Sequence, residues 1–307
     1  MTESISILRN ELGDRLSENI PLARYTTARV GGPARGLVTV DSTHDLIQLV
    51  NFLHSKSMKY KILGEGSNIL VSDSGFDGLV IINHTREIEY DLASEIPVVK
   101  ADSGVNLVTL ARKISEHGLS GFEWACGIPG SLGGAVYGNA GANGSDMQTN
   151  LITADILQPG EDAETWTCDM FQYAYRSSVL KRENSLAAIL KASLRMEKQD
   201  LEVIREKMAF FNARRKETQP AGASLGSIFK NPPGDHAGRL IEAAGLKGKR
   251  IGGAEVSNKH ANFILNGSRA TAQEIYQLIK LVQYEVNKQT GTSLETEIEF
   301  LGNFDLE

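Results

Sequence analysis

The stretch from Gly121 to Gly144, GFEWACGIPGSLGGAVYGNAGANG, constrains the fold more than any other part of the chain. Glycine in the interior of a helix or strand costs roughly 0.5–1 kcal/mol relative to alanine, so this spacing predicts neither kind of ordinary element. Backbone without side chains lets a bulky anionic ligand approach closely, and successive amide N–H groups can form an anion-binding nest. The stretch is therefore interpreted as the wall of a binding site.

A second glycine-rich segment lies upstream, where Gly64-Glu65-Gly66-Ser67-Asn68 separates two apolar runs. Its backbone amides, with the side chains of Ser67 and Asn68, are suited to cradle a pyrophosphate, although a simple hairpin turn is the alternative. The dinucleotide fingerprint requires a helix after its glycines. Because Ile69-Leu70-Val71 continues as a strand, the sequence disfavours a Rossmann domain and favours a cofactor held by two separate loops.

The composition is that of a globular protein of 307 residues, with 41% hydrophobic residues, 23% charged residues and a formal charge of −6. No sustained basic run suggests a nucleic-acid groove or an anionic membrane surface. No apolar segment approaches the ~20 residues that span a bilayer. Cys126 and Cys168 provide neither a disulfide framework nor a metal spacing. We therefore expect a reduced, cytoplasmic setting and no metal, nucleic-acid, membrane or protein partner.

Helical and strand patterns alternate irregularly along the chain, which indicates the α+β class. Apolar positions at helical spacing predict helices over residues 1–20, 106–117 and 271–289, and a helix that Ser42 or Thr43 can cap. Residues 200–216 are expected to form a charged helix. The helix over residues 271–289 carries a Thr271/Glu274 capping box. The final strand is predicted over Thr296–Leu301.

Six motifs in order identify a family: GEGSNILVSDSGFDGLVI, GIPGSLGGAVYGNAGA, YRSS, GSIFKNPPG, AGRLIEAAGLKGKRIGGAEVSNKHANFILN and LETEIEFLG. Over residues 20–303 the chain resembles the UDP-N-acetylenolpyruvoylglucosamine reductase (MurB) family, in its compact type II branch. The resemblance implies a two-part FAD-binding module of the vanillyl-alcohol-oxidase (PCMH) type and an α+β C-terminal substrate domain. The implied parts are residues 1–82 with the tail 300–307, residues 83–200, and residues 201–299.

The resemblance also implies an activity. Members of the family reduce the enolpyruvyl double bond of a UDP-sugar to the lactyl ether of UDP-N-acetylmuramate, using NADPH as co-substrate and non-covalent FAD. Negative charge that develops on the substrate carboxylate calls for a fixed guanidinium, and Arg176 of the YRSS motif matches it. Ser227 matches the family's proton donor, and Glu297 matches the glutamate that helps to hold and polarise the enol intermediate.

Binding residues follow from the same motif matches. The implied cofactor contacts are Gly64, Gly66, Ser67, Asn68, Ile69, Ile128, Pro129, Gly130, Ser131, Gly133, Gly134 and Ala135. The implied substrate contacts are Tyr175, Arg215 and Asn231.

The sequence departs from the family pattern at Gly138, Asn143 and Glu299, the last standing where many members carry arginine. These departures leave open a degenerate nucleotide-binding homologue without activity. The shared cofactor fold leaves open a flavin-dependent alcohol oxidase or dehydrogenase. Cys126 beside the wall raises the idea of a covalent flavin, whereas a small buried cysteine is the simpler interpretation.

Overall fold

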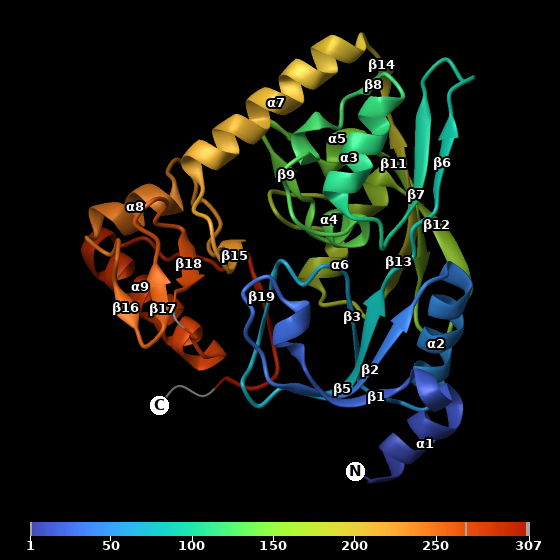
Figure 1. Cartoon of the computed structure of the whole chain (residues 1–307), viewed down its shortest axis with the longest axis horizontal. Helices are drawn as coiled ribbons and strands as arrows, with labels where there is room; N and C mark the ends of the chain where they lie inside the picture. The colour runs from blue at the N-terminus through green and yellow to red at the C-terminus, as the bar shows by residue number, and fades with distance from the viewer. Residues whose placement is uncertain (1, 268, 305–307) are drawn as a thin grey trace. The chain divides into compact units, whose positions relative to one another are not determined.

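A computed structural model describes residues 2–267 and 269–304 of the chain (Figure 1). The chain forms two compact units, and their segments alternate along the sequence. Unit 1 consists of the described residues of Met1–Leu37, Gly66–Gly78 and Lys216–Glu307, and unit 2 of Val38–Glu65 and Leu79–Arg215. Three elements begin in one unit and end in the other: β2 (Pro33–Val40), β5 (Phe76–Asn83) and α7 (Leu201–Thr218).

Unit 2 is built on a five-stranded sheet of order β12-β11-β13-β7-β6, in which every neighbouring pair is antiparallel. The buried faces of its strands pack with α3 and α4 into one apolar core. The strands are β6 (Ile88–Asp91), β7 (Val98–Asp102), β11 (Leu151–Leu157), β12 (Ala163–Thr167) and β13 (Ala188–Arg195).

Helix α3 (Leu107–Glu116) shows why the local sequence specifies an element of unit 2. The side chain of Asn106 accepts a 3.0 Å hydrogen bond from the Thr109 N–H and caps the first turn. Leu107, Leu110, Ala111 and Ile114 are buried along one face. The helix ends before Gly118, which has a φ of +66°. The remaining elements of unit 2 are α2 (Thr43–Ser55), β3 (Tyr60–Leu63), β8 (Leu119–Ser120), η3 (Glu123–Ala125), α4 (Leu132–Gly138), β9 (Gly141–Ala142), β10 (Ser145–Asp146), α5 (Met147–Asn150), η4 (Cys168–Phe171), α6 (Val179–Arg182) and β14 (Glu197–Lys198).

Unit 1 contains a four-stranded antiparallel sheet of order β15-β18-β17-β16, against which α9 packs (Figure 1). Its core also includes Ala28, Val30 and Leu70 from the N-terminal segments of the unit. The elements are α1 (Thr2–Leu12), η1 (Gly13–Arg15), β1 (Ser17–Pro21), η2 (Leu22–Tyr25), β4 (Ile69–Val71), β15 (Ser224–Ser227), α8 (Ala237–Ala243), β16 (Arg250–Ile251), β17 (Ala254–Val256), β18 (Phe263–Asn266), α9 (Ala272–Thr290) and β19 (Glu299–Leu301).

Hydrogen bonds at the start of α9 join distant segments of unit 1. The predicted capping box is confirmed, because the Thr271 side chain accepts from the Glu274 N–H and the Glu274 carboxylate accepts from the Thr271 N–H. The carboxylate of Asp73 accepts two more first-turn N–H groups, at 2.9 Å from Ala272 and 2.8 Å from Gln273. The loop after β4 is thus bound to the helix that covers the C-terminal sheet.

Two expectations about local structure are wrong. The N-terminal helix ends at Leu12 rather than near residue 20, because Gly13 adopts a φ of +52° and Ser17–Pro21 pair with β2 as strand β1. The glycine-rich stretch does contain a helix, α4, which holds three glycines. Ser131 caps α4, and burial of Leu132, Ala135 and Val136 offsets its weak helix propensity.

The three-part division at residues 82/83 and 200/201 stays a prediction. Within unit 1, β19 pairs in parallel with β4, so the chain near residue 300 lies beside the strand that follows the first glycine-rich loop. Residues 305–307 of the predicted tail lie outside the described residues.

Candidate functional site

The first glycine-rich loop joins β3 to β4 through backbone that only glycine fits. Gly66 has a φ of +58°, and a Cβ there would overlap the carbonyl oxygen of Tyr25. The Thr27 N–H donates a 3.1 Å hydrogen bond to the Gly66 carbonyl, which holds the loop in unit 1. Gly64 and Ser131 both belong to unit 2, and a Cβ at Gly64 would overlap the hydroxyl of Ser131. The two glycine-rich segments of the sequence therefore meet at Gly64 and Ser131.

The second loop, Ile128–Ala135, lies along residues 103–107 of unit 2. Three main-chain hydrogen bonds hold it there: Leu107 N–H to Gly130 O at 2.9 Å, Leu132 N–H to Val105 O at 2.8 Å, and Gly133 N–H to Ser103 O at 2.7 Å. The Ser131 hydroxyl accepts the Gly134 N–H at 3.3 Å and begins α4.

One face of α4 carries no side chains. Gly134 is exposed, and a Cβ at Gly138, four residues further on, would meet no atom within 4 Å. Positions four apart lie above one another on a helix. The residues present therefore fit a flat, bulky cofactor such as FAD, which can approach the backbone of α4 here. Gly138, a departure from the family pattern, adds to this open face.

Arg176 stands at the tip of a tight turn in unit 2. Ala174 and Ser177 exchange two 3.0 Å main-chain hydrogen bonds, and Arg176 between them has a φ of +54°. Its Nη2 donates to the carbonyl oxygen of Gly141 at 2.5 Å, and its Cζ lies 5.4 Å from the centre of the Tyr175 ring. The Tyr175 side chain is 53% exposed. The turn thus places the predicted catalytic arginine on the glycine-rich stretch.

Side chains that the sequence did not single out attach this turn to the C-terminal end of α4. The Tyr173 hydroxyl donates to Val136 O at 2.7 Å, and the Ser178 hydroxyl to Tyr137 O at 2.6 Å. The Asn139 amide donates to Ala174 O at 3.2 Å. Burial raises the pKa of Tyr173, so its phenol stays a neutral donor. In the sequence, the second serine of the YRSS motif, Ser178, was the signal that could have indicated this attachment.

Helix α7 packs on residues 123–127 within unit 2. The carboxylate of Glu123, 3% exposed, accepts from Lys207 Nζ at 3.2 Å. The Cys126 thiol contacts Met208 O at 3.7 Å, and burial raises its pKa, as expected of a small buried cysteine. A Cβ at Gly127 would lie 2.8 Å from Cδ of Arg215. Gly127 therefore makes room for the predicted substrate arginine.

Arg215 is a half-buried cation whose pKa is lowered by burial. Among the residues that the structure describes, no carboxylate forms an ion pair with it. A desolvated guanidinium without a protein anion is suited to bind a phosphate group.

Ser227 and Glu297 belong to adjoining segments of unit 1. Ser227 ends β15, and the carbonyl oxygen of the next residue, Ile228, accepts the Glu297 N–H at 2.8 Å. Buried Asn262 fixes the same segment, because its side chain bonds both the N–H and the carbonyl of Phe229, at 2.9 and 2.8 Å. Asn262 was not predicted, although it lies within a recognised motif.

The first glycine-rich loop reaches the same place. The side-chain amide of Asn68 donates to the main-chain carbonyl of Glu297 at 3.2 Å. The main-chain carbonyl of Asn68 accepts the Glu299 N–H at 2.9 Å. Glu299 and Ile69 are paired residues of β19 and β4. The main chain of Glu299, the second departure, therefore supports the loop that is predicted to hold the cofactor.

Two more residues from the sequence analysis, a predicted substrate contact and a departure from the family pattern, lie outside these hydrogen-bonded groups. Asn231 is exposed, and its side-chain Oδ1 accepts the Ala237 N–H at 3.0 Å, at the start of α8. Asn143, the remaining departure, has a φ of +54°, a conformation that asparagine adopts more readily than most residues.

Each unit thus gathers part of the predicted set. Unit 2 brings Arg176 and Tyr175 together beside Gly141 and, separately, seats Arg215 beside Gly127. Unit 1 brings together Ser227, Glu297 and Asn68. In the described part of the chain, no cluster of three metal-ligating side chains occurs. No helix among the described residues is both long and apolar enough to cross a membrane.

Comparison with known proteins defines the class. A family profile described as "FAD binding domain" matches residues 34–166. A second, described as "UDP-N-acetylenolpyruvoylglucosamine reductase, C-terminal domain", matches residues 218–301. With the side-chain-free face of α4, these matches define an FAD-containing oxidoreductase of the α+β class, with a C-terminal domain added to the flavin module.

Closer relatives define the family. The chain is 39% identical to the UDP-N-acetylenolpyruvoylglucosamine reductase of Bacillus subtilis (strain 168), over 98% of this chain and 99% of the relative. It is 37% identical to that of Chloroflexus aggregans, over 95% and 99%. The crystal structure of MurB from Thermus caldophilus superposes with a TM-score of 0.80 at 35% identity, covering 93% of this chain and 98% of the other. The chain belongs to the UDP-N-acetylenolpyruvoylglucosamine reductase family, which confirms the sequence resemblance.

Proposed function

We propose that the chain catalyses NADPH-dependent reduction of the enolpyruvyl ether of UDP-N-acetyl-enolpyruvoylglucosamine to UDP-N-acetylmuramate, a step of peptidoglycan precursor synthesis. The observation that carries the proposal is that Glu297 is hydrogen-bonded in unit 1 both to Asn68 and to Ile228, the residue that follows Ser227. These bonds join a proton donor and a carboxylate to the loop predicted to bind the cofactor pyrophosphate. FAD, when bound, takes a hydride from NADPH and supplies it to the β-carbon of the substrate.

Three residues of the chain then stabilise the developing negative charge and supply the proton. Arg176 has five donors, and the bond to Gly141 O orients the guanidinium toward a substrate carboxylate that gains negative charge. Ser227 Oγ delivers a proton to the α-carbon, and Glu297 helps to hold and polarise the enol. The identity of these three catalytic residues rests on the motif matches and on their local contacts.

The binding residues divide between cofactor and substrate. Gly64, Gly66, Ser67 and Asn68 would receive the pyrophosphate of FAD, while the Ile128–Ala135 loop would receive its ring system. Arg215, without a carboxylate partner among the described residues, would bind a phosphate of the UDP-sugar. Tyr175 and Asn231 are exposed positions from which side chains would contact the sugar nucleotide.

An anaerobic absorbance experiment tests the proposal. Purified protein reconstituted with FAD should lose its flavin band when NADPH is added and regain it when the enolpyruvyl sugar nucleotide follows. A flavin oxidase would instead turn over alcohols with oxygen and ignore the sugar nucleotide. The match of residues 218–301 to the reductase C-terminal domain supports the reductase. Protein that does not bind FAD at all would support the inactive, degenerate alternative.

A further inference from the structure

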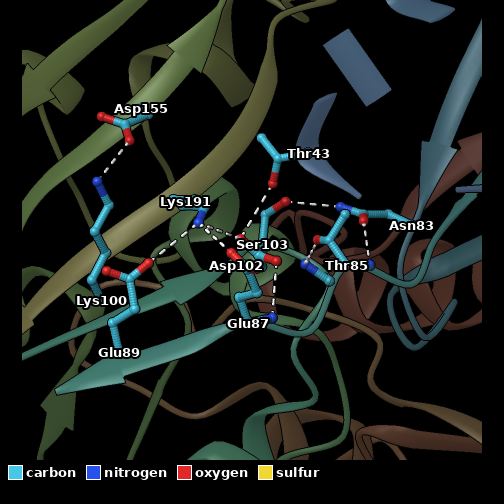
Figure 2. Close-up of polar contacts among 11 residues, drawn as sticks. Thr43, Asn83, Thr85, Glu87, Glu89, Lys100, Asp102, Ser103, Asp155 and Lys191 are labelled. Atoms are coloured by element: carbon cyan, nitrogen blue, oxygen red, sulfur yellow. Dashed lines mark hydrogen bonds and ion pairs between the residues drawn. The ribbon is translucent and has the colours of Figure 1, made fainter. Parts of the chain in front are cut away.

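In unit 2, the buried carboxylate of Asp102 forms an ion pair with Lys191 (Figure 2). Asp102, the last residue of β7, has a side chain that is 3% exposed. Its Oδ1 lies 3.3 Å from Lys191 Nζ and accepts from the Thr43 hydroxyl at 3.2 Å. Its Oδ2 accepts the Glu87 N–H at 2.9 Å. Helix α2, strand β13 and the loop before β6 therefore each contribute a partner to one carboxylate.

Lys191 comes from the neighbouring strand β13, and its side chain is 18% exposed. It also contacts Glu87 at 2.9 Å and Glu89 at 3.5 Å. Its hydrogen bond with Glu87, together with the charge of Asp102, raises its pKa, so it remains a cation. Ion pairs taken out of water often contribute little net stability, while the loss of one partner is strongly unfavourable. Such a pair is suited to fix geometry.

The two residues that follow Asp102 are also fixed by hydrogen bonds and by a close backbone contact. The Ser103 hydroxyl accepts from the Asn83 amide at 2.8 Å, and the Gly104 N–H donates to the Thr85 hydroxyl at 3.1 Å. A Cβ at Gly104 would lie 2.7 Å from the backbone of Thr85. Figure 2 shows Ser103, Asn83 and Thr85 side by side with the ion pair.

Residues 103–107 hold the glycine-rich loop Ile128–Ala135 in place through main-chain hydrogen bonds. Ser103 O and Val105 O accept the N–H groups of Gly133 and Leu132, and the Leu107 N–H donates to Gly130 O. A shift of Asp102 would move Ser103 directly, and through it Gly133, which precedes the exposed Gly134 in α4.

We propose that Asp102, held by Lys191, is a positioning residue for the flavin. It fixes residues 103–107 and thereby sets the Gly130–Gly134 backbone against which the cofactor ring lies. The inference rests on the proposed function, which assigns FAD to this loop. Neither residue is expected to touch the cofactor or the substrate.

The test compares Asp102→Asn with Asp155→Asn in the full-length protein. Asp155 pairs with Lys100 at 3.3 Å in the same sheet, so the control removes the same charge without touching residues 103–107. For each variant, the FAD dissociation constant, the visible spectrum and midpoint potential of the bound flavin, and the melting temperature of the apoprotein are measured. We expect Asp102→Asn to weaken FAD binding about tenfold or more, since it breaks a charge-assisted contact. It should also shift the spectrum and potential, while Asp155→Asn changes neither.

A flavin with unchanged affinity, spectrum and potential in Asp102→Asn would overturn the inference, even if the apoprotein melted at a lower temperature. If Asp102→Asn does not fold, Lys191→Met and Lys191→Arg replace it, since arginine keeps the cation. Lys191→Arg should then retain FAD affinity that Lys191→Met loses, and equal affinities would overturn the proposal. Wild-type protein that binds no FAD would refute the proposed function as well, which distinguishes the two failures.

Discussion

The side-chain amide of Asn68 donates a 3.2 Å hydrogen bond to the main-chain carbonyl of Glu297, 229 residues further along the chain. One residue thus belongs to the loop predicted to bind the cofactor and also positions the predicted catalytic glutamate. In Asn68→Ala we expect re-oxidation of reduced flavin by the sugar nucleotide to slow roughly 10–100-fold, because Glu297 is displaced. Flavin reduction by NADPH should fall much less. Stopped-flow measurement of both half-reactions checks this, with Ser67→Ala as the control from the same loop. Equal slowing of both half-reactions would contradict the positioning role.

Ser227→Ala should separate proton delivery from hydride supply. Loss of a general acid lowers the rate by about 10²–10⁴-fold, and only the step that uses the sugar nucleotide needs this proton. Reduction of FAD by NADPH should stay close to the wild-type rate. The same stopped-flow experiment decides the matter, and a parallel fall in flavin reduction would exclude the proton-donor assignment.

Gly64→Ala should impair FAD binding through Ser131. The new Cβ would overlap the Ser131 hydroxyl, so one of the two glycine-rich loops must move. Ser131→Gly removes the obstructing atoms, and glycine at an N-cap costs only a few tenths of a kcal/mol. The double variant should therefore recover much of the FAD affinity that Gly64→Ala loses in a titration of the apoprotein. Without such recovery, the contact between the loops does not control binding.

Gly127→Ala should act on substrate binding through Arg215. The added Cβ, 2.8 Å from Cδ of Arg215, would push the guanidinium away from its place beside residue 127. Loss of a charge-assisted bond to phosphate should raise KM for the UDP-sugar about 10–100-fold, with flavin reduction by NADPH unchanged. The double variant with Arg215→Ala should be no worse than Arg215→Ala alone. Additive effects would show that Gly127 acts through another residue.

Glu123→Gln should change the acid stability of the protein. Burial by itself raises the pKa of this carboxyl, but hydrogen bonds from Ser120, Lys207 and Gly121 outweigh it, and the net pKa lies below 4.5. A carboxyl with a lowered folded pKa contributes stability that is present above pH 4.5 and is lost as the pH falls below it. The variant should be less stable by roughly 1–3 kcal/mol at pH 7 and lose less on acidification.

Urea midpoints at pH 7 and at pH 4 test this expectation. Glu116→Gln, from an exposed pair with Arg112, serves as the control because surface pairs contribute little. Parallel pH profiles for wild type and Glu123→Gln would show that the carboxylate does not act as described.

Much of the local structure was accessible from the sequence. The capping box of α9, the helix expected over residues 106–117 and the strand–loop–strand around Gly66 depend on neighbouring residues, and all three are confirmed. The N-terminal helix was overextended because β1 gains its stability from pairing with β2, a partner that helical periodicity does not reveal. The helix α4 was missed because burial of its apolar face offsets its three glycines.

The sequence by itself determined the family, the two glycine-rich loops and the candidate residues Arg176, Ser227 and Glu297. These features depend on the order of the motifs and on local backbone requirements, both of which can be read from neighbouring residues. Only the tertiary structure decided how these residues are held. The bonds from Asn68 to Glu297, from Arg176 to Gly141 and from Gly133 to Ser103 join segments far apart in sequence. Such contacts form only when burial and strand pairing have brought the segments together, so no local pattern encodes them.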